Sequence, residues 1–315
     1  MTLPDEKPTN EALLEEFEDK ISTSRAKTTI KKQKNIIQNF IKYLNCEGKH
    51  FFDIKEKDID KWLNKKKSDI KYSTKSKITG ILKVFYDFLI KRKYLTDNPF
   101  AETSQEIRKK ASKIKTPRPI LTIADVTKII RATTNPLNRA ILLTLYKTGM
   151  RRGELVQLDL ENIVWGERRI HIPKRKGGSP GDVYFDDECE RTLRIWISVR
   201  VAKESETADG KIIIEQALFT GVRGERIDET WVGRIVKQNA IKCGVGTDTT
   251  DSSKAITPHV FRYAFTTHLA KSRCHPKVIQ LLRGDSDATM LDRYTQFTPE
   301  EVRDEYLRTI PKLGV

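Results

Sequence analysis

The sequence predicts a mostly α-helical protein with one small β-sheet, divided into two domains. The chain has 315 residues, a length that suits two domains of ordinary size better than one core. Apolar residues recur at helical spacing within residues 24–100 and again beyond residue 120, whereas β-prone runs are confined to one stretch. We therefore expect two separate cores, with the sheet in the second domain.

The composition is strongly basic. The net charge is +16 and the pI is about 9.6, so the surface attracts polyanions, of which nucleic acid is the commonest. A membrane surface also attracts Lys and Arg, but the chain has no element suited to insertion. The N-terminus is acidic and unlike a secretory signal, and no apolar run could span a bilayer. We expect a soluble, cytoplasmic protein that binds nucleic acid and no membrane.

Cysteine spacing argues against metal and disulfide chemistry. Cys46, Cys189, Cys243 and Cys274 are far apart, with no CxxC pair and no His at ligand spacing. Neither a zinc site nor a disulfide framework is indicated. We expect reduced, packed cysteines, no metal and no cofactor.

The first predicted domain covers residues 24–100 and follows an acidic N-terminal segment, residues 1–23. Its first helix is rich in lysine, and a second short helix fits DIKEKDIDKWLNKKK. A third helix is expected to begin after Ser73, a plausible N-cap, and to end before the breaker Asn98-Pro99. The apolar positions of the first and third helices are Ile37, Phe40, Ile41, Leu44, Ile78, Ile81, Leu82, Phe85, Phe88 and Leu89.

Residues 101–119 are polar and basic and end in two prolines, which favours an extended linker. The second domain, residues 120–297, opens with a helix capped at Thr122, and Gly149 suits a left-handed helix end. Two β-prone runs, 170–172 and 183–185, flank a Gly/Pro/Ser turn and predict a hairpin. The rest is predicted to be helical, including a C-terminal helix and apolar tail over residues 298–315 that opens with a capping box at Thr298.

The polar residues that carry chemistry form an ordered set in the second domain. The segments TGMRRGELVQL, IPKRKGGSPGDVYF, TPHVFRYAFTTHLA and LLRGDSDATMLDRYTQF contain Arg151, Glu154, Lys176, His259, Arg262 and Tyr294. Together they resemble the conserved boxes of tyrosine recombinases, the family of phage integrases and Xer-type enzymes, over most of the chain. The resemblance implies a helical core-binding (SAM-like) domain followed by a mixed α/β tyrosine recombinase catalytic domain.

The resemblance assigns the first two boxes directly. The family has an arginine after a helix-ending Thr-Gly, followed by Gly-Glu-Leu, which selects Arg151 and Glu154 and leaves Arg152 as a neighbour. His259 and Arg262 fill the His-x-x-Arg box, and their spacing of three places both side chains on one helical face.

The remaining boxes fit less completely. The family's hairpin lysine aligns with Lys176, with Lys174 as an alternative. Tyr294 lies nine residues after Asp285, at the spacing that the family shows from a histidine. A carboxylate in that place accepts hydrogen bonds but cannot donate one unless protonated, and it is unfavourable beside a phosphate. Either Arg283 and the catalytic arginines offset this charge, or activity is reduced.

The implied roles follow from the chemistry of a phosphodiester. Attack builds negative charge on the non-bridging oxygens, which guanidinium groups stabilise through forked hydrogen bonds. A tyrosyl ester to the 3′ phosphate conserves the bond energy, so religation needs neither ATP nor metal. Five roles are implied: Arg151 and Arg262 bind the phosphate, Tyr294 is the nucleophile, Lys176 protonates the leaving 5′ oxygen, His259 aids proton transfer, and Glu154 orients a catalytic side chain.

The resemblance also implies partners. We expect both domains to contact double-stranded DNA, self-assembly into a tetramer on paired sites with protomer contacts through residues 298–315, and possible accessory DNA-bending or directionality proteins. The alternatives are a type IB topoisomerase or telomere resolvase, and a DNA-binding protein of the same fold that has lost catalysis through Asp285. The target sequence and cleavage in cis or in trans are left open.

Overall fold

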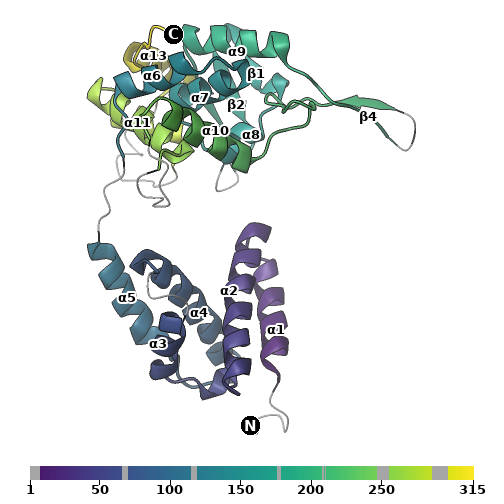
Figure 1. Cartoon of the computed structure of the whole chain (residues 1–315), viewed down its shortest axis with the longest axis vertical. Coiled ribbons are helices and arrows are strands. Elements are labelled where there is room, and N and C mark those ends of the chain that lie inside the picture. Colours follow the sequence, from purple (N-terminus) through teal and green to yellow (C-terminus); the bar gives the residue numbers. More distant parts are fainter. Residues whose placement is uncertain are drawn as a thin grey trace. The chain divides into compact units, whose positions relative to one another are not determined.

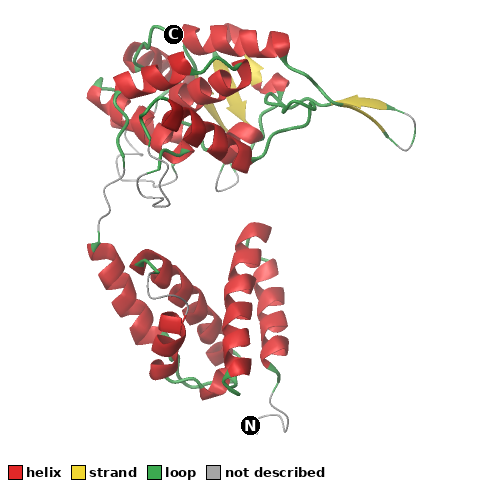
Figure 2. Ribbon diagram, in the orientation of Figure 1, coloured by secondary structure: helices red, strands yellow, loops and turns green. Residues whose placement is uncertain are grey.

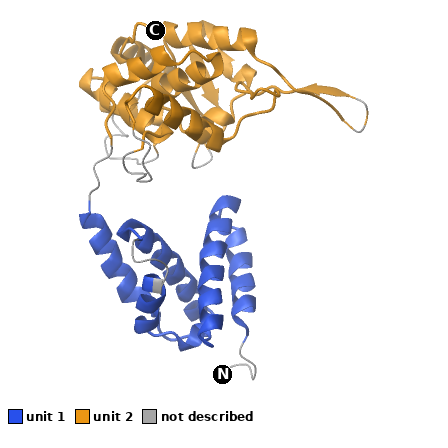
Figure 3. Ribbon diagram, viewed as in Figure 1, with its two compact units in different colours: residues 1–116 blue, residues 117–315 orange. Residues whose placement is uncertain are grey.

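The computed structural model describes residues 8–65, 70–114, 119–175, 179–207, 209, 211–246, 255–285 and 297–315. The chain divides into two compact units, Met1–Thr116 and Pro117–Val315 (Figure 3). The first unit is helical, and the second combines helices with two small sheets (Figure 2). The predicted fold class, mostly α with a small β-sheet, is confirmed.

The first unit is built from five helices and one 3-10 turn in its described residues (Figure 1). They are α1 (Asn10–Ser22), α2 (Lys27–Cys46), η1 (Phe51–Asp53), α3 (Glu56–Lys65), α4 (Tyr72–Lys91) and α5 (Ala101–Lys113). Helix α4 begins at Tyr72 with Lys71 as its N-cap, so the prediction of an N-cap at Ser73 is wrong by two positions. The core is aromatic and includes Phe17, Phe40, Phe51, Trp62, Phe85, Tyr86 and Phe100.

Helix α1 corrects the prediction that residues 1–23 lie outside the first domain. Leu13 and Phe17 recur on one helical face and are buried, while the acidic side chains lie mostly on the other positions. The Phe17 ring meets the Phe85 ring edge to face, with 5.2 Å between centroids. The acidic composition thus belongs to the solvent side of an amphipathic helix that completes the core.

Helix α5 corrects the prediction of an extended linker over residues 101–119. Residues 101–113 are helical, Ile107 is buried in the core of the first unit, and the Thr103 hydroxyl donates to Glu56 at 3.1 Å. One apolar contact face therefore outweighs the polar composition of the segment.

The second unit surrounds helix α7, which is buried along most of its length. Its described elements are α6 (Ile123–Ala132), α7 (Pro136–Thr148), α8 (Arg152–Val156), η2 (Leu160–Asn162), β1 (Ile163–Val164), η3 (Trp165–Glu167), β2 (Arg169–Ile172), β3 (Gly181–Tyr184), α9 (Asp187–Val199), β4 (Glu204–Glu206), β5 (Ile212–Ile214), α10 (Glu229–Lys242), α11 (Pro258–Lys271), α12 (Pro276–Arg283) and α13 (Pro299–Thr309). The main sheet has the antiparallel order β1-β2-β3, with Ile170 opposite Val183. The predicted hairpin is confirmed.

The end of α7 lies against α11, beside the residues of the candidate active site. Gly149 ends α7 with a φ of 61°, the left-handed conformation predicted for it. A Cβ at this position would lie 2.2 Å from the Phe265 ring of α11, so glycine also permits the close approach of the two helices. The chain then turns directly into α8, whose first residues carry the first motif.

A second hairpin was not predicted. Strands β4 and β5 pair in antiparallel register, with Ser205 opposite Ile213, and project from the helices of the second unit (Figure 1). Ile212, Ile213 and Ile214 are all exposed. The prediction that the chain after residue 185 is helical apart from loops is therefore wrong here, because a run of three isoleucines favours strand even without burial.

The C-terminal segment packs against its own unit in this structure. Helix α13 begins with the predicted capping box at Thr298, and Tyr306 is fully buried. Beyond the helix, the fully buried ammonium of Lys147 donates to Asp186 at 2.7 Å, Glu188 at 2.6 Å and the Pro311 carbonyl at 2.7 Å. Burial opposes ionisation of Glu188, but hydrogen bonds from Lys147 and the tail amides outweigh it and lower its pKa.

All four cysteines are free in the described structure. Cys189 and Cys274 are buried as predicted, whereas Cys46 is exposed. Burial raises the pKa of the Cys189 thiol to about 12, so this group is inert. Among the described residues, none of the helices combines the length and apolar character needed to cross a membrane.

Replacing Lys147 with methionine should destabilise the chain strongly. The substitution leaves Asp186 and Glu188 buried without their shared cation, a change that costs about 3–5 kcal/mol. Urea denaturation of the full chain, followed by tryptophan fluorescence, measures the effect. The matched control is Lys312→Met, because Lys312 pairs with Asp186 and Asp187 but its side chain is 56% exposed, and its loss should cost less than about 1 kcal/mol. Equal effects of both variants would contradict the prediction.

Candidate active site

Arg151 stands at the turn between α7 and α8. It is the N-cap of α8, and its backbone amide donates to Glu154 Oε2 at 2.7 Å. Its Nη1 donates to the other oxygen of the same carboxylate at 2.8 Å. Glu154 is only 5% exposed, so it holds both the backbone and the guanidinium of Arg151 from within the protein. Arg152 instead points to the surface and pairs with Glu229 at 2.9 Å.

Arg262 comes from α11, the helix that packs on the end of α7. Its Nη1 donates to the Gly149 carbonyl at 2.6 Å and its Nη2 to the Arg283 carbonyl at 2.7 Å. Burial, together with the positive charges of Arg151 and Arg283, lowers the pKa of Arg262 to about 10. The group therefore stays cationic at neutral pH, and two backbone carbonyls fix its direction.

Asp285 joins these groups. Its Oδ1 accepts from Arg151 Nη2 at 3.0 Å and from Arg262 Nη2 at 3.2 Å, and its Oδ2 pairs with Arg283 Nε at 2.9 Å. Three arginines therefore surround one carboxylate, and the local charge stays positive. The contacts that the first alternative requires are therefore present, while the effect of Asp285 on activity stays a prediction.

A cavity of about 250 Å³ opens over this cluster. Its lining residues are Arg151, His259, Arg262, Tyr263, Thr266, Arg283 and Asp285. His259 is exposed and lies one helical turn before Arg262, as the spacing predicted. Guanidinium groups fixed by carbonyls and carboxylates, beside an exposed imidazole, form a site for an anionic oxygen ligand.

Two of the predicted site residues, Lys176 and Tyr294, lie outside the described residues. The alternative lysine, Lys174, is described and exposed. Arg175, the last described residue before Lys176, donates through Nη1 to the Leu282 carbonyl at 3.3 Å, three residues before the described chain stops at Asp285. The chain thus enters both segments from one region, beside the arginine cluster.

Sequence reasoning missed two residues of this region. Tyr263 lines the cavity next to Arg262, and its only sequence signal is its place in the His-x-x-Arg segment. Arg175 is 7% exposed, although it stands in a run of basic residues that reads as a solvated loop. Within the part of the chain that the structure describes, no group of three or more His, Cys, Asp or Glu could hold a metal ion.

The comparisons with known proteins agree with this geometry. Residues 119–301 match the Phage integrase family, and residues 14–93 match the Phage integrase, N-terminal SAM-like domain. The first match alone covers more than half of the chain. Tyrosine recombinase XerD of Staphylococcus epidermidis is 27% identical over 255 residues, which are 78% of this chain and 79% of that protein.

Solved structures share the fold. A lambda integrase dimer bound to a COC′ core site aligns with a TM-score of 0.69 at 19% identity, covering 92% of this chain and 98% of that one. A lambda integrase tetramer bound to a Holliday junction aligns with a TM-score of 0.67 at 19% identity, covering 90% and 80%. At this identity the likeness establishes the architecture alone.

The match over residues 119–301 shows that this chain belongs to the Phage integrase family. It is a tyrosine recombinase, an enzyme of site-specific DNA recombination.

Asp285→Asn should strengthen DNA binding. Asp285 competes with phosphate for the N–H groups of Arg151 and Arg262, and its charge repels phosphate. We expect a roughly tenfold gain in affinity, about 1.4 kcal/mol, and a plot of log affinity against log salt steeper by about one unit. Fluorescence anisotropy with a labelled duplex at several salt concentrations measures both.

Asp304→Asn provides the matched control. It makes the same change in charge on α13, where the Asp304 side chain is 68% exposed and pairs only locally with Arg303. Its effect on affinity should be small, because exposed charges are screened. Weaker binding by Asp285→Asn, or an equal gain in both variants, would show that Asp285 does not compete with DNA.

Proposed function

We propose that the arginine cluster binds the scissile phosphate of double-stranded DNA and that Tyr294 attacks it. One observation carries the proposal: a single carboxylate oxygen of Asp285 accepts from both Arg151 Nη2 and Arg262 Nη2. An oxygen placed between two fixed guanidinium groups resembles a non-bridging phosphate oxygen bound by both. On DNA binding, a phosphate oxygen takes over these N–H groups.

The reaction then exchanges one ester bond at phosphorus for another. The Tyr294 oxygen attacks phosphorus, its proton passes to an acceptor, and the bond to the 5′ oxygen breaks. Lys176 gives the leaving oxygen a proton, and His259 assists proton transfer at the phosphate. Arg151 and Arg262 stabilise the charge that develops on the non-bridging oxygens. Religation reverses the same steps with a new 5′ hydroxyl.

Glu154 serves as the group that orients Arg151. It is buried and holds the amide and the guanidinium of the same residue, so the guanidinium keeps its direction before substrate arrives. Preorganisation of this kind stabilises a transition state without reorganisation at the moment of reaction. Replacing Glu154 with a neutral residue would weaken its bonds to Arg151 and leave the direction of the Arg151 guanidinium less well defined.

Both units take part in DNA binding in this proposal. Lysines of residues 24–100 and of the segment to 119 contact phosphates and give affinity that falls with salt. By analogy with the lambda integrase tetramer on a Holliday junction, four protomers assemble on paired sites in the cytoplasm, aided in some reactions by accessory DNA-bending or directionality proteins. Residues 298–315 exchange their contacts on their own unit for contacts with a neighbouring protomer.

Wild-type protein should form an SDS-resistant adduct with DNA, and Tyr294→Phe should form none. The phenol oxygen is the atom that becomes esterified, so its removal abolishes the adduct rather than slowing it. The proteins are incubated with supercoiled DNA from the natural source and denatured, and the attached fragments are sequenced. Attachment through a 3′ phosphate at recurrent sites is expected.

Tyr263→Phe is the control variant, because Tyr263 also lines the cavity and is 48% exposed. It should retain the adduct. An adduct that survives Tyr294→Phe and is lost with Tyr263→Phe would reassign the nucleophile, and DNA binding by the wild type without any adduct would refute the catalytic proposal.

The two lysines of the hairpin can also be separated. Lys176→Met should slow adduct formation by about 10²–10⁴, the usual contribution of a general acid, whereas Lys174→Met should leave the rate within about twofold of wild type, since an exposed lysine adds only screened attraction. Single-turnover cleavage of the recovered site measures both rates. The reverse order would assign the proton donor to Lys174.

A further inference from the structure

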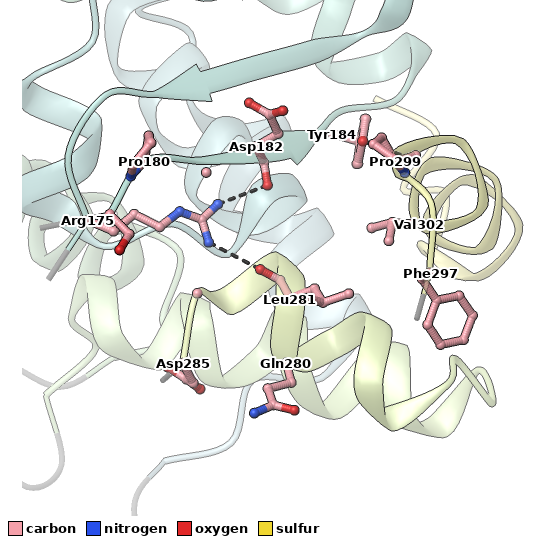
Figure 4. Close-up of a pocket in the computed structure, with 13 residues that line it drawn as sticks. Arg175, Pro180, Asp182, Tyr184, Gln280, Leu281, Asp285, Phe297, Pro299 and Val302 are labelled. Atoms are coloured by element: carbon pink, nitrogen blue, oxygen red, sulfur yellow. Dashed lines mark hydrogen bonds between the residues drawn. The ribbon is translucent and has the colours of Figure 1, made fainter. Parts of the chain in front are cut away.

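Arg175 is a buried cation whose contacts span two elements. Its Nη2 donates to the Asp182 carbonyl on β3 at 2.9 Å and its Nη1 to the Leu281 carbonyl at 3.2 Å (Figure 4). Its Nη1 also donates to the Leu282 carbonyl at 3.3 Å. Its backbone amide donates to the Ser179 carbonyl at 3.1 Å. Arg175 thus pairs with the described residue on the far side of the hairpin connection, Ser179, and ties this end of the hairpin to the end of α12.

The chain leaves room for this guanidinium at two glycines. A Cβ at Gly181 would lie 2.7 Å from Arg175 Nε, and a Cβ at Gly284 would lie 2.2 Å from Nη1. Gly284 also has a φ of +58°, as the left-handed cap of α12. Both positions therefore combine with Arg175 to form a fitted site, which an exposed arginine would not need.

Stability alone gives a weak reason for burying this charge. Burial lowers the pKa of Arg175, and its Nε is buried with no hydrogen-bond partner among the described residues. Packed apolar side chains often replace buried charges without loss of stability. The carboxyl end of a helix does favour a cation, through its free carbonyls and the helix dipole.

The same helix end also holds the phosphate-binding arginines. The next carbonyl, that of Arg283, accepts from Arg262 Nη2 at 2.7 Å and from Arg151 Nη1 at 3.4 Å. Successive carbonyls at the end of α12 therefore bind Arg175, which belongs to the hairpin loop, and the arginine pair. This helix end fixes the spacing between the loop and the pair.

We propose that Arg175 is a positioning residue: by fixing the described end of the hairpin to the helix end that also holds Arg151 and Arg262, it supports the reaction step assigned to its chain neighbour Lys176. The inference rests on the proposed function of Lys176 as proton donor to the leaving 5′ oxygen. In that step the bond from phosphorus to the 5′ oxygen breaks, the oxygen keeps the electron pair, and the lysine ammonium supplies the proton. Without the Arg175 guanidinium, the hairpin end at residues 174–175 loses its bonds to the end of α12, and protonation of the leaving oxygen should slow.

The test uses a leaving group that does not require a proton. The recovered target site is made with its ordinary 5′ oxygen and, separately, with sulfur at the bridging 5′ position. A thiol has a pKa of about 8.5, so it departs as a thiolate without a general acid. Single-turnover adduct formation is measured on both substrates for wild type, Arg175→Met, Arg175→Lys and Lys176→Met.

Arg175→Met should slow cleavage of the ordinary substrate by about 10-fold to 10²-fold, up to the smaller contribution expected of a general acid. On the sulfur substrate, its rate should return to within about threefold of wild type. Arg175→Lys keeps the charge at the helix end but loses the forked guanidinium that reaches two elements. Its cleavage rate on the ordinary substrate should therefore lie between the rates of wild type and Arg175→Met. It also supplies a folded variant if the methionine variant is unstable in thermal denaturation.

Arg200→Met is the matched control. Arg200 also donates through its guanidinium to carbonyls, those of Ala217 at 2.8 Å and Glu215 at 2.5 Å, but away from the cavity. It should cleave both substrates at a similar rate relative to wild type. If Arg175→Met is equally slow on both substrates, its defect is structural and unrelated to the proton donor. If it cleaves both substrates at the wild-type rate, Arg175 has no role in cleavage. Either result overturns the inference.

The two proposals fail in different ways. If Lys176→Met is not rescued by sulfur while Arg175→Met is, the proton donor is another group that Arg175 positions, and the assignment of Lys176 is wrong. If Lys176→Met is rescued and Arg175→Met is not, the general acid stands and the role of Arg175 falls. A wild type that forms no adduct on either substrate removes both proposals.

Discussion

The carboxyl end of α12 is the constraint on which the site depends. A helix leaves its last carbonyls without intrahelical partners, and here guanidinium groups from three other parts of the chain satisfy them. Arg175 comes from the hairpin, Arg151 from the start of α8 and Arg262 from α11. Because each cation is held by fixed backbone dipoles, the cluster exists before any anion arrives. The arrangement is an electrostatic site built on tertiary contacts.

Asp285 offsets the electrostatic repulsion within this cluster of arginines. Two guanidinium groups that face one another repel, and burial already lowers the pKa of Arg262. A carboxylate between them offsets the repulsion and holds their directions, at the expense of competition with phosphate. Asp285, at the position where the family resemblance places a histidine, therefore lies among three arginines, with Arg283 as the additional partner.

The rest of the second unit keeps these elements in register. Helix α7 ends at Gly149, whose carbonyl accepts from Arg262 while its missing Cβ lets Phe265 approach. Two residues earlier in α7, Lys147 ties the helix to Asp186, Glu188 and the C-terminal tail. The candidate site and the C-terminal segment are thus connected through one buried helix.

Local features were determined by the sequence itself: the caps at Thr122 and Thr298, the turn at Gly149, and the one-face spacing of His259 and Arg262. These depend on residues within one or two turns of each other. The partners of Asp285 and the burial of Arg175 were decided only by the tertiary structure, because Arg151 and Asp285 are 134 positions apart. The folding of α1 and α5 into the first core was decided in the same way, since long-range packing overrode the composition that had favoured solvent.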